Sequence, residues 1–323
     1  MSKFNSVSQL NEEIKKLNLH FGIELKELVH LLELLEKVNT CNQEYEIVKE
    51  SIVVSYNLKL NLFNFRKFPP LYVPIQVIGL PISVSTKGYF GDDNLVEKTI
   101  KNRKGLKILL NGDSLFNGGG KTLSTFIFEN KFKCFDDYLN ALRSPYRRRI
   151  NKALRYRDNL HIRRFINKDF NSEHYNLYLS IMSRTDNPLE TLPVEFFREY
   201  DAELYEFINK NNEKVIGFIQ LKKIENNLYF LFGGFNKDDV KKFDIYYNML
   251  LKIVEIGIEK QVSKIEFGQT AEESKIKIGC KEKFKYLYIH HSNPIINFFI
   301  QMLVPIFSYK PYPIKHHVFK LED

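Results

Sequence analysis

The spacing of apolar residues changes repeatedly along the chain, from the three- and four-residue steps of helices to the alternation of strands. Met249, Leu250, Ile253 and Val254 follow the helical spacing and predict a helix over 243–260. By the same criterion the other helices cover a mostly helical segment 1–50, then 94–101, 135–156, 172–184, 194–200, 272–278 and 294–307. Strands are predicted over 52–62, 71–78, 107–110, 122–129, 161–166, 203–209, 215–222, 228–235, 264–267 and 281–291.

This order predicts an α+β protein with two units of ordinary domain size. We expect an N-terminal helical segment at 1–50, a first unit at 51–140, a second unit at 141–293, and an apolar C-terminal helix and tail at 294–323. In the second unit, a helix joins the strand ending near 235 to the strand at 264–267. The loop that follows therefore opens at a strand's carboxyl end, where α/β sheets hold ligands.

Composition narrows the class of protein. The 323 residues are 44% hydrophobic and 27% charged, as in globular proteins. Cys41, Cys134 and Cys280 are scattered, so we expect neither a disulfide framework nor a metal site, and a reducing cytoplasm is the simplest setting. No signal peptide and no apolar run of transmembrane length is visible, so we expect a cytoplasmic protein without a membrane span.

The net charge of +9 indicates affinity for an anion such as tRNA, a phosphorylated donor or an acidic membrane surface, or else a general enrichment in lysine. Arginine dominates one stretch only. Arg147, Arg148, Arg149 and Lys152 lie there, and guanidinium groups suit phosphate oxygens in a bidentate manner. This stretch is either a phosphate or nucleic-acid contact or a solvated helix face.

Gly118-Gly119-Gly120-Lys121-Thr122 imitates part of a phosphate-binding loop. That motif needs a glycine five residues before Gly120, where the chain has Leu115, and a following helix, where the chain predicts a strand. We interpret the segment as a glycine-rich hairpin turn.

The succession of elements in the second half resembles the GNAT acyltransferase fold, and within it the Fem-like group that includes peptidoglycan branch-forming transferases. Ser144–Ile150 and Ile265–Thr270 carry the resemblance, extended by Lys275, Gly279 and 286–294. The resemblance implies two GNAT-like units with mixed, mainly antiparallel sheets flanked by helices. It also implies transfer of an acyl or aminoacyl group from a thioester or tRNA ester to an amine or hydroxyl acceptor, such as a small molecule or an envelope precursor.

The resemblance places donor binding on the last strand of the meander. Gly233 and Gly234, followed by Phe235, stand where that fold keeps a bulge, whose free N–H groups would hold the donor carbonyl. Lys275 is a candidate contact for a phosphate or carboxylate of the substrate, or a surface partner of Glu272.

Three residues are candidates for the chemistry. Gln269 would polarise a carbonyl, or only cap a turn. Tyr247 would act as an acid, while Tyr246 lies on the apolar stripe and is expected in the core. His290 has the pKa of a base at neutral pH, or simply ends a strand.

The donor stays open at this stage. CoA-dependent GNAT enzymes bind pyrophosphate with a glycine-rich loop, but this chain has Asn236–Lys241 there, with two carboxylates and no glycine. That departure disfavours ordinary CoA binding and leaves aminoacyl-tRNA, or an acyl-CoA held in another way, as the co-substrate. No tightly bound cofactor is expected.

Two other functions fit the sequence. One is a non-catalytic, degenerate GNAT module that binds envelope precursors or a protein partner. The other is an RNA-binding protein that uses the Arg147–Arg157 face. Separately, the apolar helix at 294–307 is either docked in the core or lies on the inner face of a membrane as a peripheral contact.

Overall fold

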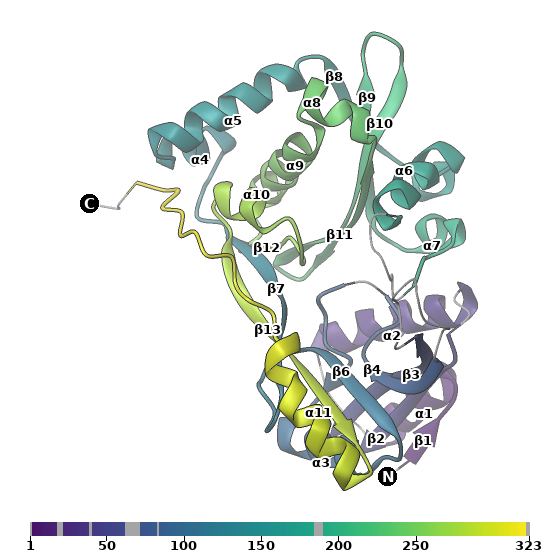
Figure 1. The fold of residues 1–323 in the computed structure, drawn as a ribbon. Coiled ribbons are helices and arrows are strands. Elements are labelled where there is room, and N and C mark those ends of the chain that lie inside the picture. The colour runs from purple at the N-terminus through teal and green to yellow at the C-terminus, as the bar shows by residue number, and fades with distance from the viewer. Residues whose placement is uncertain are drawn as a thin grey trace. The chain divides into compact units, whose positions relative to one another are not determined.

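The chain was studied as a computed structural model, shown in Figure 1, which describes residues 2–17, 22–38, 41–61, 72–82, 84–183 and 190–320. Residues 62, 71 and 184, which end three of the predicted elements, lie outside these ranges.

The chain forms two compact units, one of residues 1–124 and 284–311 and one of residues 125–283 and 312–323. This division differs from the segments expected at 1–50, 51–140, 141–293 and 294–323. It passes through two strands, β7 (Gly120–Glu129) and β13 (Lys281–His291), each of which leaves one unit and continues in the other. Hydrophobic periodicity identifies a strand, but it does not show that the two halves of the strand belong to different units.

Unit 1 holds a mixed sheet in the order β1-β2-β3-β4-β6-β13. The pair β4–β6 is parallel, the other neighbours are antiparallel, and β5 adds to the edge of β3. Its further strands are β1 (Ser2–Phe4), β2 (Gln43–Val48), β3 (Ser51–Asn61), β4 (Tyr72–Ile78), β5 (Tyr89–Phe90) and β6 (Leu106–Gly112). Its helices are α1 (Val7–Lys16), α2 (Gly22–Val38), α3 (Asp93–Asn102) and α11 (Pro294–Phe307).

Two expectations for unit 1 were wrong. The segment 1–50, expected to be helical, contains the strand β2. Glu46 lies buried on this strand, where it pairs with the guanidinium of Arg103 at 2.5 Å. In the sequence, a glutamate that is buried in a strand cannot be told from one on the polar face of a helix. The glycine-rich segment 118–122 is not a hairpin turn, because β6 pairs with β13 and β4. A Cβ on Gly120 would lie 2.9 Å from Val304, so glycine there allows α11 to pack closely.

In unit 2 the strands follow the order β7-β12-β11-β10-β9-β8. Strands β11 and β12 are parallel, and β8 to β11 form an antiparallel meander. Its strands besides β7 are β8 (Leu160–Phe165), β9 (Glu203–Asn209), β10 (Lys214–Ile224), β11 (Asn227–Phe235) and β12 (Lys264–Glu266). Its helices are α4 (Phe135–Ala141), α5 (Ser144–Arg157), α6 (Ser172–Met182), α7 (Val194–Glu199), α8 (Val240–Phe243), α9 (Ile245–Glu259) and α10 (Glu272–Lys277).

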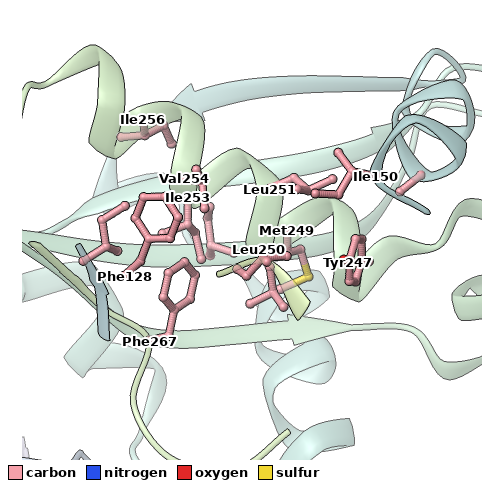
Figure 2. Packing of buried hydrophobic residues seen from close by; sticks show 14 of the residues in the cluster. Phe128, Ile150, Tyr247, Met249, Leu250, Leu251, Ile253, Val254, Ile256 and Phe267 are labelled. Atoms are coloured by element: carbon pink, nitrogen blue, oxygen red, sulfur yellow. The ribbon is translucent and has the colours of Figure 1, made fainter. Parts of the chain in front are cut away.

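The core of unit 2 is built around α9. As Figure 2 shows, Leu250, Ile253 and Val254 of this helix pack beside Phe128 of β7 and Phe267, which follows β12. In Figure 1, α4, α5 and α9 lie on one side of the sheet, and α6 and α7 on the other. The central helix is apolar on most of its faces because it is covered both by the sheet and by α5.

The helix ends follow ordinary capping chemistry. The predicted helix 135–156 is divided into α4 and α5, and Pro145 occupies the first turn of α5, where a missing N–H costs nothing. The cap of α6 is Asn171 rather than the expected Ser172, and His174 completes a capping box with it. Gly279 has φ of 101°, as expected for the residue that ends α10.

Candidate active site

The two parallel strands of unit 2 separate after three residues. Asn227, Leu228 and Tyr229 of β11 pair with Lys264, Ile265 and Glu266 of β12. The chain after β12 then follows β7, because the N–H of Phe267 donates to the carbonyl of Phe126 at 2.8 Å. Beyond Tyr229, β11 continues to Phe235 without a partner on β12. Beyond Tyr229 this edge of β11 has no strand partner on β12 among the described residues, at the carboxyl end of both strands, where ligands bind in such sheets.

A strained loop follows the point of separation. Gly268, Thr270 and Ala271 have φ of 68°, 64° and 49°, and Ala271 is the N-cap of α10. Threonine and alanine adopt this left-handed region only at a cost, so the loop is held by its surroundings. Gln269 lies within it and is half-buried, while Thr270 is exposed.

Lys275 holds this loop from beneath. Its Nζ donates to the carbonyl oxygens of Gly268 and Gln269 at 3.1 and 2.6 Å, and the residue is only 2% exposed. Burial lowers the pKa of the Lys275 amine to about 7. Lys275 is therefore not the surface partner of Glu272 that the sequence also allowed.

Cys280 lies next to this amine. Its N–H donates to the Lys275 carbonyl at 3.1 Å, and burial raises the pKa of its thiol, so the thiol stays protonated. The hydroxyl of Tyr138 donates to the carbonyl of Ile278 at 3.0 Å in the same region. The scattered cysteine in the sequence gave no signal of this environment.

Tyr247 lies in the first turn of α9 and is more deeply buried than expected, at 4% exposed. The Arg149 guanidinium lies 4.1 Å from its ring centroid, and Asp244 accepts both arginine donors, at 2.5 and 3.0 Å. The Tyr247 hydroxyl is buried without a hydrogen-bond partner among the described residues, and burial raises the pKa of Tyr247. Tyr246, expected in the core, is only partly buried and packs against Phe235 at 5.5 Å between ring centroids, so of the two tyrosines Tyr247 is the one in the core.

The bulge of β11 is at Leu231, not at the two glycines. The register with β10 slips between Phe230 and Phe232, whereas Gly233 and Gly234 remain paired with β10. The glycines serve packing: a Cβ on Gly234 would lie 2.5–2.6 Å from the backbone of α6, and one on Gly233 would lie 2.9 Å from Met249 of α9. The bulge that the sequence placed at Gly233 and Gly234 is therefore at Leu231.

The arginine-rich helix α5 divides into two functional sets. Arg149 and Arg157 pair with carboxylates of unit 2, Asp244 and Glu255. Arg148, Lys152 and Arg155 are exposed at positions i, i+4 and i+7, on one face, and no carboxylate of the described residues pairs with them. We call these three residues the basic stripe. Arg147, also predicted as a phosphate contact, is half-buried.

The segment after β11 carries the two carboxylates that the sequence showed, Asp238 and Asp239. Lys237–Asp239 forms a short 3-10 turn whose cap Asn236 accepts from the N–H of Asp238 at 3.1 Å. Asp244, at φ of 49°, then caps α9. The negative charge of the two carboxylates, Asp238 and Asp239, would oppose a phosphate group at this segment.

His290 belongs to unit 1, whereas Gln269 and Tyr247 belong to unit 2. Its register partner on β6 is Lys107, a buried lysine whose pKa is lowered to about 8 by burial and by Arg103. Burial and the charges of Lys107 and Lys101 lower the pKa of His290, which favours the neutral imidazole.

The sequence did not single out a buried pair on the other face of unit 2. His174 Nε2 lies 2.9 Å from Glu206 Oε2, and Arg163 Nε donates to the other carboxylate oxygen at 2.5 Å. Although burial raises the pKa of Glu206, the hydrogen bonds from His174 and Arg163 outweigh it and lower the pKa. The spacing of Asn171 and His174 was the local signal of the capping box, but the partner comes from β9.

A cavity of about 780 Å³ lies between α4, α5, β8 and the C-terminal end of α9. Leu139, Leu154 and Ile258 line it, beside the Arg157–Glu255 ion pair at 2.6 Å. It is at the opposite end of α9 from Tyr247. Across the ranges that the structure describes, no group of three or more His, Cys, Asp or Glu side chains has the geometry of a metal site.

No protein-family model and no curated protein sequence matches the chain. Solved structures do. FemX matches with a TM-score of 0.51 at 11% identity, over 93% of this chain and 100% of that one. The C-terminal domain of a protein assigned as a lysylphosphatidylglycerol synthetase from Agrobacterium fabrum matches with a TM-score of 0.51 at 10% identity, over 93% and 97%.

A GCN5-related N-acetyltransferase from Sphaerobacter thermophilus matches less closely, with a TM-score of 0.42 at 9% identity, over 82% of this chain and 85% of that one. At such identities, likeness shows the fold. The α+β fold class with GNAT-like units is confirmed, and the chain shares its fold with FemX and the synthetase domain, as the resemblance to Fem-like GNAT proteins indicated.

Proposed function

We propose that the protein transfers an acyl or aminoacyl group from an ester or thioester donor to an amine or hydroxyl acceptor, at the opening between β11 and β12. The observation that carries this proposal is the separation of the two parallel strands after Tyr229 and Glu266. It exposes backbone groups of β11, and the bulge at Leu231 frees one more residue from the ladder. Backbone N–H groups so placed would stabilise the oxyanion of a tetrahedral intermediate.

The reaction needs little from side chains beyond orientation. The acceptor nitrogen or oxygen bonds to the donor carbonyl carbon, the bond to the leaving oxygen or sulfur breaks, and the acceptor's proton passes to the leaving group. Gln269 lies in the loop at the mouth of the opening, where its amide would polarise the carbonyl. Lys275 is a positioning residue, since it holds the backbone of Gln269 and is itself buried.

Two observations favour a tRNA ester over CoA as the donor. Asp238 and Asp239 lie in the segment where the GNAT resemblance would place a pyrophosphate, and the basic stripe of α5 offers three exposed cations to a polyanion. In addition, one neighbour of the same fold is named for lysylphosphatidylglycerol, an aminoacylated lipid. We extend the proposal to an acceptor that is an envelope precursor or lipid.

A thermal-shift panel at fixed salt tests the donor. The matched ligands are one tRNA in its aminoacylated and deacylated forms, with acetyl-CoA, a long-chain acyl-CoA and free CoA beside them. A ligand that binds the folded state raises the midpoint by mass action. We expect aminoacylated tRNA to stabilise more than deacylated tRNA, and the protein to release the amino acid to an added amine acceptor in a Gln269-dependent manner.

The other outcomes reassign the function. Stabilisation by a CoA species alone would move the donor to a thioester. Binding without turnover of any donor would identify a non-catalytic module. Equal and steeply salt-dependent binding of both tRNA forms, unchanged in Gln269→Ala, would identify an RNA-binding protein that uses α5.

A further inference from the structure

Helix α11 is an uncharged helix at the surface of unit 1. Its 14 residues include no acidic or basic side chain. Asn293 caps it, accepting from the N–H groups of Ile295 and Ile296 at 2.9 and 3.2 Å. The helix is thus a formed element with an ordinary start, not a frayed tail.

The helix is oriented with its polar side toward the protein. Asn297 Oδ1 accepts from the N–H of His291 at 3.0 Å, and Gln301 Nε2 donates to the carbonyl of Ile289 at 2.9 Å. Both partners belong to β13, beside which α11 lies in Figure 1. Val304, 3% exposed, is the one residue of α11 among the buried core residues that we identify. The usual arrangement of a surface helix, apolar inward and polar outward, is reversed.

The opposite face of α11 is apolar and exposed. Its members recur at steps of three and four residues, and seven large side chains there are between 46% and 73% exposed: Ile295, Ile296, Phe298, Phe299, Met302, Leu303 and Ile306. Single exposed apolar residues are common on proteins, but a contiguous patch of this kind marks an interaction surface.

Cations flank both ends of this face. At the start of the helix, exposed Lys104 precedes Gly105, whose N–H donates to Ser292 Oγ at 2.9 Å. At its end, Lys310 is exposed, and the half-buried Lys121 bonds through its backbone to Ser308 and Tyr309 while its amine lies 3.9 Å from the ring centroid of Phe284. An apolar face between basic ends matches an anionic lipid surface, with acyl chains beneath and phosphates around.

We propose that α11 is an interfacial helix that binds unit 1 to the surface of an anionic bilayer. The proposal goes beyond acyl transfer and does not depend on it. At 1.5 Å per residue the helix is about 21 Å long, which suits lying in the interface but not spanning the hydrocarbon core. Consistently, no helix within the described ranges has the length and hydropathy to cross a membrane. A second copy of the chain suits the face less well, since pairing would bring like charges together.

Vesicle flotation tests this proposal with the full chain. The vesicles are phosphatidylglycerol–phosphatidylcholine mixtures and pure phosphatidylcholine. The test variant is Phe298→Gln/Met302→Gln, whose original side chains are 62% and 60% exposed. The matched control is Leu115→Gln/Ile166→Gln, at 59% and 63% exposed. Since both substitutions remove apolar area that would enter the lipid, we expect the test variant to lose tenfold or more of its binding to anionic vesicles, and the control to retain it.

A second readout locates the contact. The chain has 0 tryptophans, so Phe298→Trp introduces a unique fluorophore. Its emission should shift to the blue on adding anionic vesicles, whereas Ile166→Trp should not shift. Equal losses in test and control variants, or wild-type protein that does not float, would overturn the proposal. So would a concentration-dependent dimer in solution that Phe298→Gln/Met302→Gln abolishes, because the occupant would then be a second copy.

Discussion

The amine of Lys275 donates to the carbonyl of Gln269 at 2.6 Å, so a buried amine supports the backbone of the residue proposed to polarise the donor. We expect Lys275→Met to loosen the loop over 268–271, where Thr270 and Ala271 are held at positive φ. Loss of the two hydrogen bonds from the amine, each worth about 0.5–1.5 kcal/mol, should accelerate hydrogen exchange of these amides roughly tenfold.

The control for this change is on the same helix. Lys277 pairs with Glu273 at the surface, and Lys277→Met should leave exchange in the loop unchanged. Acceleration in both variants would show that α10 as a whole, and not the Lys275 amine, holds the loop.

The lowered pKa of Lys275 predicts a pH-dependent stability. Between its folded pKa of about 7 and the ordinary value of 10.5, the unfolded state binds more protons than the folded state. The free energy of unfolding should therefore rise as pH increases from 7 toward 10, with a slope approaching about 1.4 kcal/mol per pH unit from this group. Urea denaturation of wild-type protein and Lys275→Met at several pH values measures the difference. An identical slope in the two proteins would refute this assignment.

Gly234 should matter for packing before it matters for binding. A Cβ there would meet the backbone of Leu177 and Tyr178 at 2.5–2.6 Å, so Gly234→Ala forces α6 away from β11. Overpacking of this kind costs about 1–3 kcal/mol, which urea denaturation can measure. Gly79→Ala is the control, because a Cβ at that position approaches nothing closer than 3.5 Å. A fully stable Gly234→Ala variant would show that packing does not require glycine there, and Gly234 would again be a candidate donor contact.

Asp244 combines two roles that substitution can separate. Asparagine tolerates its left-handed conformation but loses the charge that pairs with Arg149, a partly exposed residue, so Asp244→Asn should cost about 1 kcal/mol or less. Asp244→Ala also introduces strain at φ of 49°, for a further 1–2 kcal/mol or so. The urea midpoints should rank wild type, asparagine, alanine; equal midpoints for the two variants would exclude backbone strain.

The basic stripe makes a quantitative prediction for tRNA. Removing three phosphate contacts with Arg148→Ala/Lys152→Ala/Arg155→Ala should reduce the slope of log affinity against log salt by about 2–3, measured by filter binding between roughly 50 and 200 mM salt. Lys15→Ala/Lys16→Ala/Lys98→Ala removes the same charge from exposed positions of unit 1. A slope that falls equally in both variants would mean that net charge, not α5, attracts the tRNA.

Local patterns in the sequence were sufficient for most of the elements and for the fold class, although they missed β2. The stripe on α9, the alternation of β13, the Gly279 cap and the apolar face of α11 all depend on residues within a few positions of one another. Such spacings are imposed by helix and strand geometry, so they can be interpreted without a partner.

Only the tertiary structure decided which charged side chains pair with one another. Arg149 pairs with Asp244, 95 positions away, and Glu46 with Arg103, 57 positions away, and these pairings decide which basic residues remain exposed and that β2 is a strand. Lys275 and Lys277 are two residues apart on one helix, yet one is buried with a lowered pKa and the other is at the surface. Burial and charge compensation depend on chain segments that meet only after folding, and no local spacing encodes them.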